Sequence, residues 1–144
     1  MEFTVKSFNE LTTRELYEIL RVRCAVFSVE QKMNCQDLDE IDFDSIHIYL
    51  HEQGRIIAYF RCFLSIEYES TVQIGRCLTT SHHQGYGRML MEKGMEVIHE
   101  RFTPDNMILH AQKQAVGFYE KFGFVVCSDE YMEEGIPHYT MKLK

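Results

Sequence analysis

The sequence has few of the features that mark several large classes of protein. Among its 144 residues there are two prolines and no tryptophan, and no segment is low in complexity or repeated at a fixed period. No apolar run approaches the roughly 20 residues that cross a bilayer, and the N-terminus lacks the basic region and apolar run of a signal peptide. We therefore expect one globular domain over residues 1–144 that does not enter a membrane.

Cysteine is present, but not in a pattern that builds a framework. The five cysteines are odd in number and contain no CxxC pair, which argues against a set of disulfides and against a zinc site. Free thiols are typical of a reducing compartment, so the sequence predicts a cytoplasmic protein without a bound metal. The five residues are Cys24, Cys35, Cys62, Cys77 and Cys127.

An excess of positive charge is also missing. Lys and Arg number 15 against 22 Asp and Glu, which gives a net charge of −7. Nucleic acid is therefore a poor candidate partner, because binding it requires basic side chains that displace counterions. An acidic surface tolerates a cationic amine instead, and an anionic ligand would have to be held locally by backbone N–H groups.

Hydrophobic periodicity predicts a mixed α/β protein. Strands are expected at 3–8, 46–50, 56–66, 71–79, 107–111, 124–127 and 138–143. A capping box, Thr12 with Glu15, starts a first helix whose inner face should carry Leu16, Ile19, Leu20, Cys24 and Phe27. Further helices are expected from about residue 88 to 102 and over 114–121, with an irregular acidic segment at 29–45. Hairpins beside β-α-β units predict a mixed sheet with helices on both faces.

The stretch TSHHQGYGRMLMEKG (80–94) places a glycine turn between a strand and a helix. In this arrangement backbone N–H groups and the helix dipole converge on an anion. The stretch is neither a GxxxxGK[ST] phosphate loop nor a GxGxxG dinucleotide fingerprint. Taken alone, Gly85 and Gly87 are more simply a turn before a core helix. The stretch AVGFYEKFGF (115–124), one strand and one helix further on, favours the ligand-binding alternative.

Together these two stretches resemble the cofactor-binding core of the GNAT acetyltransferase superfamily. The segments RCAVFSVEQ (23–31), DLDEIDFDSIH (37–47), IGR (74–76) and GIPHYTM (135–141) resemble its ElaA-like branch. The resemblance extends from about Val22 to Met141. It implies a GNAT fold, a mostly antiparallel mixed sheet with helices on both faces, and N-acetyl transfer from acetyl-CoA to an amine.

The resemblance also implies which residues bind acetyl-CoA. The pantetheine arm would pair with strand backbone near Cys77, Leu78 and Thr79, in an opening between strands 71–79 and 107–111. The pyrophosphate would lie on N–H groups of the glycine turn, at His83, Gln84, Gly85, Tyr86, Gly87 and Arg88. His82 replaces the Gln or Arg that begins the family pattern, so a fixed positive charge there is not expected. Gln112 stands where many members have asparagine, and Phe118 lies beside the cofactor or simply packs in the core.

Acetyl transfer from a thioester requires an acid for the leaving thiolate and a base for the amine. Tyr119 is the candidate acid, because a phenol with a pKa of about 10 can protonate a developing thiolate. Glu30 is the candidate base, with His47 and His138 as alternatives. Arg76 could instead pair with Glu30, which would make both residues structural. The backbone N–H near Leu78 is the expected donor to the oxyanion.

Other interpretations are weaker. The run of Asp37, Asp39, Asp42 and Asp44 lacks the glycine and the terminal glutamate of a calcium loop, and is expected to be a solvated acidic entrance. Cys77 has no histidine in a motif that would make it a nucleophile. Two functions remain open: an N-acetyltransferase that transfers directly in a ternary complex, and an acyl-CoA-binding sensor with little turnover. Whether the chain forms a homodimer is open too.

Overall fold

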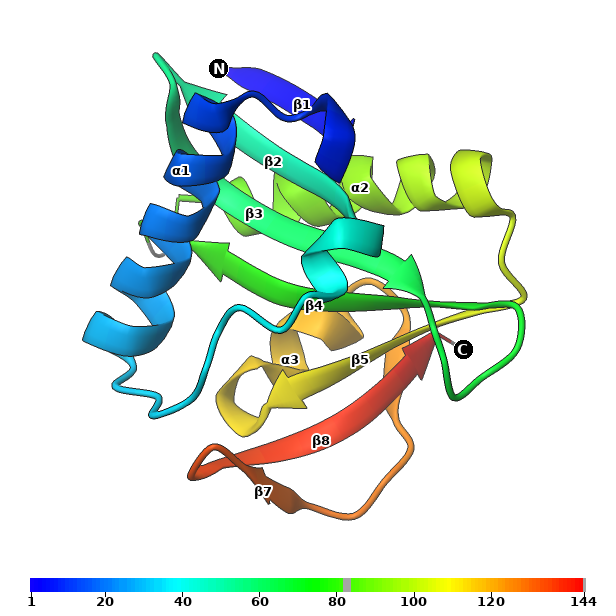
Figure 1. The fold of residues 1–144 in the computed structure, drawn as a ribbon. Coiled ribbons are helices and arrows are strands. Elements are labelled where there is room, and N and C mark those ends of the chain that lie inside the picture. The colour runs from blue at the N-terminus through cyan, green and yellow to red at the C-terminus, as the bar shows by residue number, and fades with distance from the viewer. Residues whose placement is uncertain (82–83, 144) are drawn as a thin grey trace.

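The computed structural model describes residues 1–81 and 84–143, whose strands form one mixed sheet with helices on both faces (Figure 1). The strand order is β1-β2-β3-β4-β5-β8-β6, and β7 pairs with β8. Neighbouring strands are antiparallel except β4 and β5, which are parallel. The predicted fold class is thereby confirmed. None of the helices described is long and apolar enough to cross a membrane.

Most elements lie where the periodicity predicts them. The strands are β1 (Glu2–Ser7), β2 (Ile46–Glu52), β3 (Arg55–Leu64), β4 (Thr71–Thr79), β5 (Asn106–Gln112), β6 (Phe124–Val126), β7 (Tyr131–Glu133) and β8 (Ile136–Leu143). The helices are α1 (Thr13–Arg23), α2 (Tyr86–Phe102) and α3 (Val116–Glu120). No strand was predicted at β7, since three residues with an exposed Met132 give no period to detect.

Helix α1 begins at the predicted capping box. The Thr12 side chain accepts from the Glu15 N–H at 3.1 Å, and the Glu15 carboxylate accepts from the Thr12 N–H at 2.8 Å. The expected inner face is wrong at Cys24, which is exposed, while the neighbouring Arg23 is fully buried. Ion pairs beneath the helix hold the Arg23 guanidinium inside and leave the cysteine in solvent.

The expected irregular segment is also more ordered than predicted at its start. The chain continues from α1 into a wide π-helical turn, Cys24–Glu30, closed by a hydrogen bond of 2.9 Å from the Gln31 N–H to the Val26 carbonyl. Such turns are frequent at functional sites. The turn keeps Val26 and Phe27 buried and brings residues 31–37 back over the sheet.

Two hydrophobic cores lie on opposite faces of the sheet. The smaller core packs α1 against one face, and the larger core includes residues of α2 and α3 on the other face (Figure 1). Gly94 sets how closely α2 approaches β3, because a Cβ at this position would overlap the Phe60 ring. The layers thus fix the ends of β4 and β5 between α1 and α2.

Candidate active site

Strands β4 and β5 separate toward their carboxyl ends (Figure 1). Their parallel pairing runs from Thr71 with Asn106 to Ile74 with Leu109, and the described ladder ends there although β4 continues to Thr79. On its other edge β4 stays paired with β3, up to Thr79 with Ala58. In the described part of the sheet, the β5-facing edge of this end of β4 therefore has no partner strand, which suits the addition of another extended chain.

A β-bulge lies in β4 where the two strands separate. The register changes from Gly75 opposite Arg61 to Leu78 opposite Tyr59, so that one additional residue is inserted in β4. Arg76 has a φ of 52°, a conformation that L-residues other than glycine adopt at a cost of about 1–3 kcal/mol. The insertion shifts the alternation of side chains beyond it. Cys77 packs against the larger core, and Leu78 lies in the smaller core on the α1 side.

Tyr119 meets the bulge from α3. Its side chain is 8% exposed, and its hydroxyl lies beside the Cys77 thiol. Burial, and then the neighbouring Cys77, raise the pKa of Tyr119 well above that of a free phenol. The hydroxyl is thus protonated at neutral pH. The Phe118 ring packs edge-on against Tyr119, with the ring centres 5.2 Å apart.

The glycine turn leads into the N-terminus of α2. Gly85 has a φ of 78°, and among the residues that the structure describes no side-chain hydrogen bond caps the helix, in contrast to α1. The Met89 N–H bonds the Gly85 carbonyl at 3.1 Å, so the N–H groups of residues 86–88 precede the first intrahelical bond. Free N–H groups at a helix N-terminus attract anions. Of the other predicted turn residues, Gln84 is exposed, and His83 and His82 lie outside the described residues.

Gly87 joins three elements at this point. A Cβ on Gly87 would lie 3.3 Å from both the Phe118 ring and the Thr79 methyl group. The close approach brings the end of β4, the start of α2 and the FYEKFGF helix together, as the pairing of the two sequence motifs predicted. The Arg88 guanidinium turns along the helix to Glu92, at 2.9 Å, so the backbone of Arg88 is what faces the turn.

The α1 side of the opening is covered by the segment that follows the π-helical turn. Gln112, at the end of β5, donates to the Gln31 side-chain oxygen at 2.9 Å and accepts from Gln114. The amide predicted to contact the cofactor therefore also ties this covering segment to the sheet. Glu30 is an exposed residue at the end of the turn, one position before Gln31.

The two histidines considered as bases are in different surroundings. His47 is 1% exposed, with one ring nitrogen 2.8 Å from the Tyr59 hydroxyl and the other 3.0 Å from the Asp42 carbonyl. Because both nitrogens are used inside the protein, His47 is not a base for an external amine. His138 lies opposite Gln112 on β8, and its Nδ1 donates to the Ile136 carbonyl at 2.7 Å. That bond leaves the lone pair of the neutral ring on Nε2, 3.5 Å from Glu133.

The prediction of a solvated acidic entrance is wrong for three of its four aspartates. Asp37, Asp39 and Asp42 are bonded to arginines, and Asp42 is 6% exposed. Arg76, for which Glu30 was the suggested partner, donates to Asp37 at 2.7 Å and to Asp39 at 3.3 Å. Cys35 belongs to the covering segment, and Glu134 lies in the turn between β7 and β8. Burial first, and then the charge of Glu134, raise the pKa of the Cys35 thiol, so this turn lies close to the covering segment.

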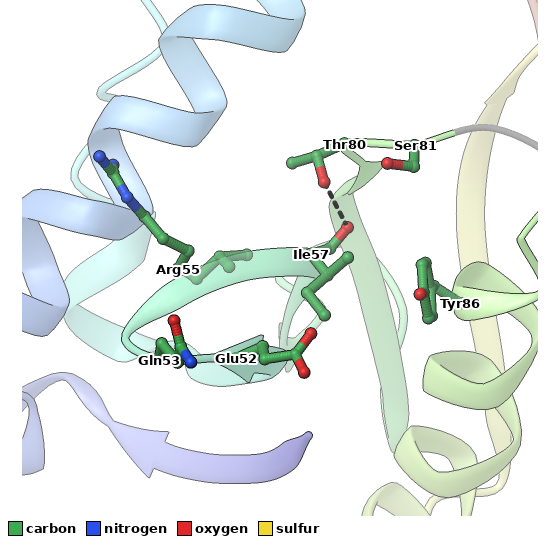
Figure 2. Close-up of a pocket in the computed structure, with 8 residues that line it drawn as sticks. Glu52, Gln53, Arg55, Ile57, Thr80, Ser81 and Tyr86 are labelled. Atoms are coloured by element: carbon green, nitrogen blue, oxygen red, sulfur yellow. Dashed lines mark hydrogen bonds between the residues drawn. The ribbon is translucent and has the colours of Figure 1, made fainter.

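A hollow of about 400 Å³ lies next to the glycine turn, beyond the end of β4 (Figure 2). Glu52 at the end of β2 and Gln53 of the β2–β3 turn form one side, and Tyr86 of α2 lies opposite. The Thr80 hydroxyl, on the strand end between them, donates to the Ile57 carbonyl at 3.3 Å. Tyr119 does not line this hollow. The hollow therefore lies beside the glycine turn and not beside the predicted catalytic tyrosine.

A bulged strand separating from its parallel neighbour, followed by an uncapped glycine turn, defines an acyl-CoA N-acyltransferase fold. The chain belongs to the GNAT acetyltransferase domain family, whose model matches residues 23–144. It is similar to a UPF0039 protein of Schizosaccharomyces pombe, at 40% identity over 100% of this chain and 97% of that protein. It is also similar to protein ElaA of Escherichia coli, at 36% identity over 92% of this chain and 90% of ElaA.

Solved structures agree with this assignment. The crystal structure of Escherichia coli ElaA superposes with a TM-score of 0.92 at 33% identity, covering 99% of both chains. An acyl-CoA N-acyltransferase from Pseudomonas aeruginosa gives the same TM-score and identity, and covers 100% of both chains. The ElaA-like resemblance inferred from the motifs is thereby confirmed.

Proposed function

We propose that this protein transfers the acetyl group of acetyl-CoA directly to a primary amine. The observation that carries the proposal is the buried Tyr119 hydroxyl, which lies beside the Cys77 side chain where β4 and β5 separate. A protonated hydroxyl at this opening can give its proton to a leaving thiolate. The uncapped N-terminus of α2 supplies the anion site expected for a pyrophosphate.

Each residue then has a definite task. Acetyl-CoA supplies an activated acetyl thioester. The backbone of Cys77, Leu78 and Thr79 aligns the arm that carries it, and a backbone N–H near Leu78 donates to the developing oxyanion. Tyr119 gives its proton to the departing thiolate, and Glu30 takes the proton of the amine. We further propose a cytoplasmic location, since all five cysteines are unpaired.

The direct test is release of free CoA when the protein is incubated with acetyl-CoA and a panel of polyamines, amino sugars and peptide N-termini. We expect release that depends on one class of amine, with the acetylated amine appearing in equal amount. Cys24 and Cys127 are exposed thiols, so the products are best separated by chromatography instead of titrated with a thiol reagent. If the protein binds acetyl-CoA but forms no acetylated product, the proposed acetyltransferase activity is wrong and the acyl-CoA-binding sensor is supported.

Replacing Gly87 with valine is expected to abolish the rise in melting temperature that acetyl-CoA produces in the wild-type protein. A ligand at 100 times its Kd stabilises the native state by about 2.7 kcal/mol. The added methyl groups would stand against Phe118 and Thr79, where the Cβ alone already approaches to 3.3 Å. Thermal melts with and without acetyl-CoA measure the effect. Gly87→Ala should give an intermediate shift, and an undiminished shift in Gly87→Val would argue against binding at this turn.

A further inference from the structure

Six charged side chains on the α1 side of the sheet form a closed ring. Each of three arginines bridges two aspartates, and each of three aspartates bridges two arginines. In order around the ring the N–O distances are Arg23–Asp37 2.9 Å, Asp37–Arg76 2.7 Å, Arg76–Asp39 3.3 Å, Asp39–Arg61 2.6 Å, Arg61–Asp42 3.0 Å and Asp42–Arg23 2.7 Å. Three positive and three negative charges make the ring neutral as a whole.

The ring is largely removed from solvent, and the pKa values of Asp39 and Asp42 are lowered within it. Arg23 and Arg61 are 0% and 2% exposed. Burial by itself raises the pKa of Asp39, but the hydrogen bonds and charges of Arg61 and Arg76 outweigh it and lower that pKa to about 2. The pKa of Asp42 is lowered in the same way by Arg23 and Arg61. A buried charge that loses its partner is strongly unfavourable, so the ring constrains the backbone of every member.

The members come from four different parts of the fold. Arg23 ends α1, and Arg61 belongs to β3. The three aspartates belong to the segment that follows the π-helical turn. Arg76 is the residue with positive φ in the β4 bulge. The ring therefore connects the segment over the amine side of the opening to the strand edge that faces the thioester.

Asp37 is the member that makes this connection. One of its carboxylate oxygens accepts from Arg76 Nε at 2.7 Å and the other accepts from Arg23 Nε at 2.9 Å. Its backbone carbonyl accepts from the same two guanidiniums, at 3.0 Å from Arg76 and 3.1 Å from Arg23. Asp42, by contrast, forms ion pairs with Arg23 and Arg61, and none of the ion pairs described joins it to Arg76.

The bulge depends on where the Arg76 side chain lies. Val72 and Ile74 face the larger core, so in a regular strand the next side chain on that face would be that of Arg76. The bulge turns Arg76 to the ring instead and gives the core position to Cys77, whose sulfur meets the Tyr119 hydroxyl. The contacts to Asp37 offset the cost of the positive φ. They also help to keep the Arg76 guanidinium out of the larger core. Without them the Arg76 side chain is held by Asp39 alone among the ring carboxylates, and the bulge backbone can shift, which would move Cys77 and Leu78.

We propose that Asp37 is a positioning residue for acyl transfer: acting through Arg76, it holds the β4 bulge in the register that sets the Cys77 and Leu78 backbone against the thioester. This inference rests on the function proposed above. It predicts that loss of the Asp37 contacts lowers turnover more than it lowers acetyl-CoA affinity. Misplacement of reacting groups by about 1 Å can cost on the order of 10²-fold in rate.

The test compares Asp37→Asn with Asp42→Asn, which removes one ring charge of the same kind at a site that does not contact Arg76. We expect Asp42→Asn to lower the melting temperature at least as much, because Asp42 is the more buried, while turnover stays near that of the wild type. Asp37→Asn should lower kcat by about 10²-fold with little change in the KM for acetyl-CoA. Arg76→Lys keeps the positive charge but loses the planar guanidinium that bonds two carboxylates at once, so we expect it to reproduce the loss of kcat. It also serves as a second variant if Asp37→Asn does not fold.

A readout independent of turnover separates this inference from the proposed function. In ¹H–¹⁵N spectra of the protein without ligand, Asp37→Asn and Arg76→Lys should shift the amide signals of Cys77 and Leu78, and Asp42→Asn should shift them much less. If Asp37→Asn and Asp42→Asn shift these amide signals equally, or lower kcat equally, the ring only stabilises the fold and the inference is wrong. A wild-type protein without turnover would refute the proposed function, and the amide shifts would still decide whether Asp37 controls the bulge.

Discussion

Replacement of Tyr119 by phenylalanine is expected to lower kcat by about 10²–10⁴-fold and to leave acetyl-CoA binding nearly intact. The phenylalanine ring preserves the packing against Phe118 and removes only the hydroxyl that points to the edge of β4. Without this donor the thiolate leaves unprotonated, which penalises the transition state and not the bound ground state. Steady-state kinetics together with the thermal shift on acetyl-CoA addition measure the two effects separately.

Tyr59→Phe is the matched control for this experiment. It also removes a buried tyrosine hydroxyl, one that bonds His47 on the α1 side of the sheet. Any loss of activity caused only by lower stability should therefore appear in both variants. Full turnover in Tyr119→Phe would show that Tyr119 serves the packing of α3, and another proton donor would be required.

The fold, and the approach of the glycine turn to the FYEKFGF helix, could be predicted because their signals are local. The strand 71–79, the glycine turn and the helix after it follow one another in the chain, and alternation, glycine and helical periodicity report each of them. The FYEKFGF helix is separated from the turn by one helix and one strand. Parallel pairing of that strand with β4 then suffices to bring Tyr119 to the end of the same opening.

The acceptor side was mispredicted because its determinants are distant in sequence. Asp37 and Arg76 are 39 residues apart, and an acidic run without its arginines looks like a solvated loop. One signal was present: Arg61 and Arg76 interrupt apolar strands, and a buried arginine requires carboxylate partners. The bulge left no mark in the sequence, since Arg76 is not a residue that favours positive φ. Strand β7 is too short for its periodicity to be detected.

The second prediction with a large expected effect concerns the group that removes the proton from the amine. An alkylamine resembling lysine has a pKa near 10.4 and is mostly protonated at pH 7, yet the attacking species must be neutral. We expect Glu30→Gln to lower kcat/KM by about 10²–10⁴-fold for such an amine, without weakening acetyl-CoA binding. For an amine of low pKa the loss should be much smaller, because its free base is already abundant. In the wild type, kcat/KM should rise with pH along a single ionisation as the neutral amine becomes populated.

Glu40→Gln is the control for charge, since it removes one exposed carboxylate from the same segment of the chain. It should change kcat/KM little for either amine. If Glu30→Gln costs the two amines equally, Glu30 is structural and the base must be sought elsewhere. His138 is then the next candidate, because its Nδ1 donates to the Ile136 carbonyl and its Nε2 lies 3.5 Å from Glu133. In that case His138→Gln, and not Glu30→Gln, should show the dependence on the pKa of the amine.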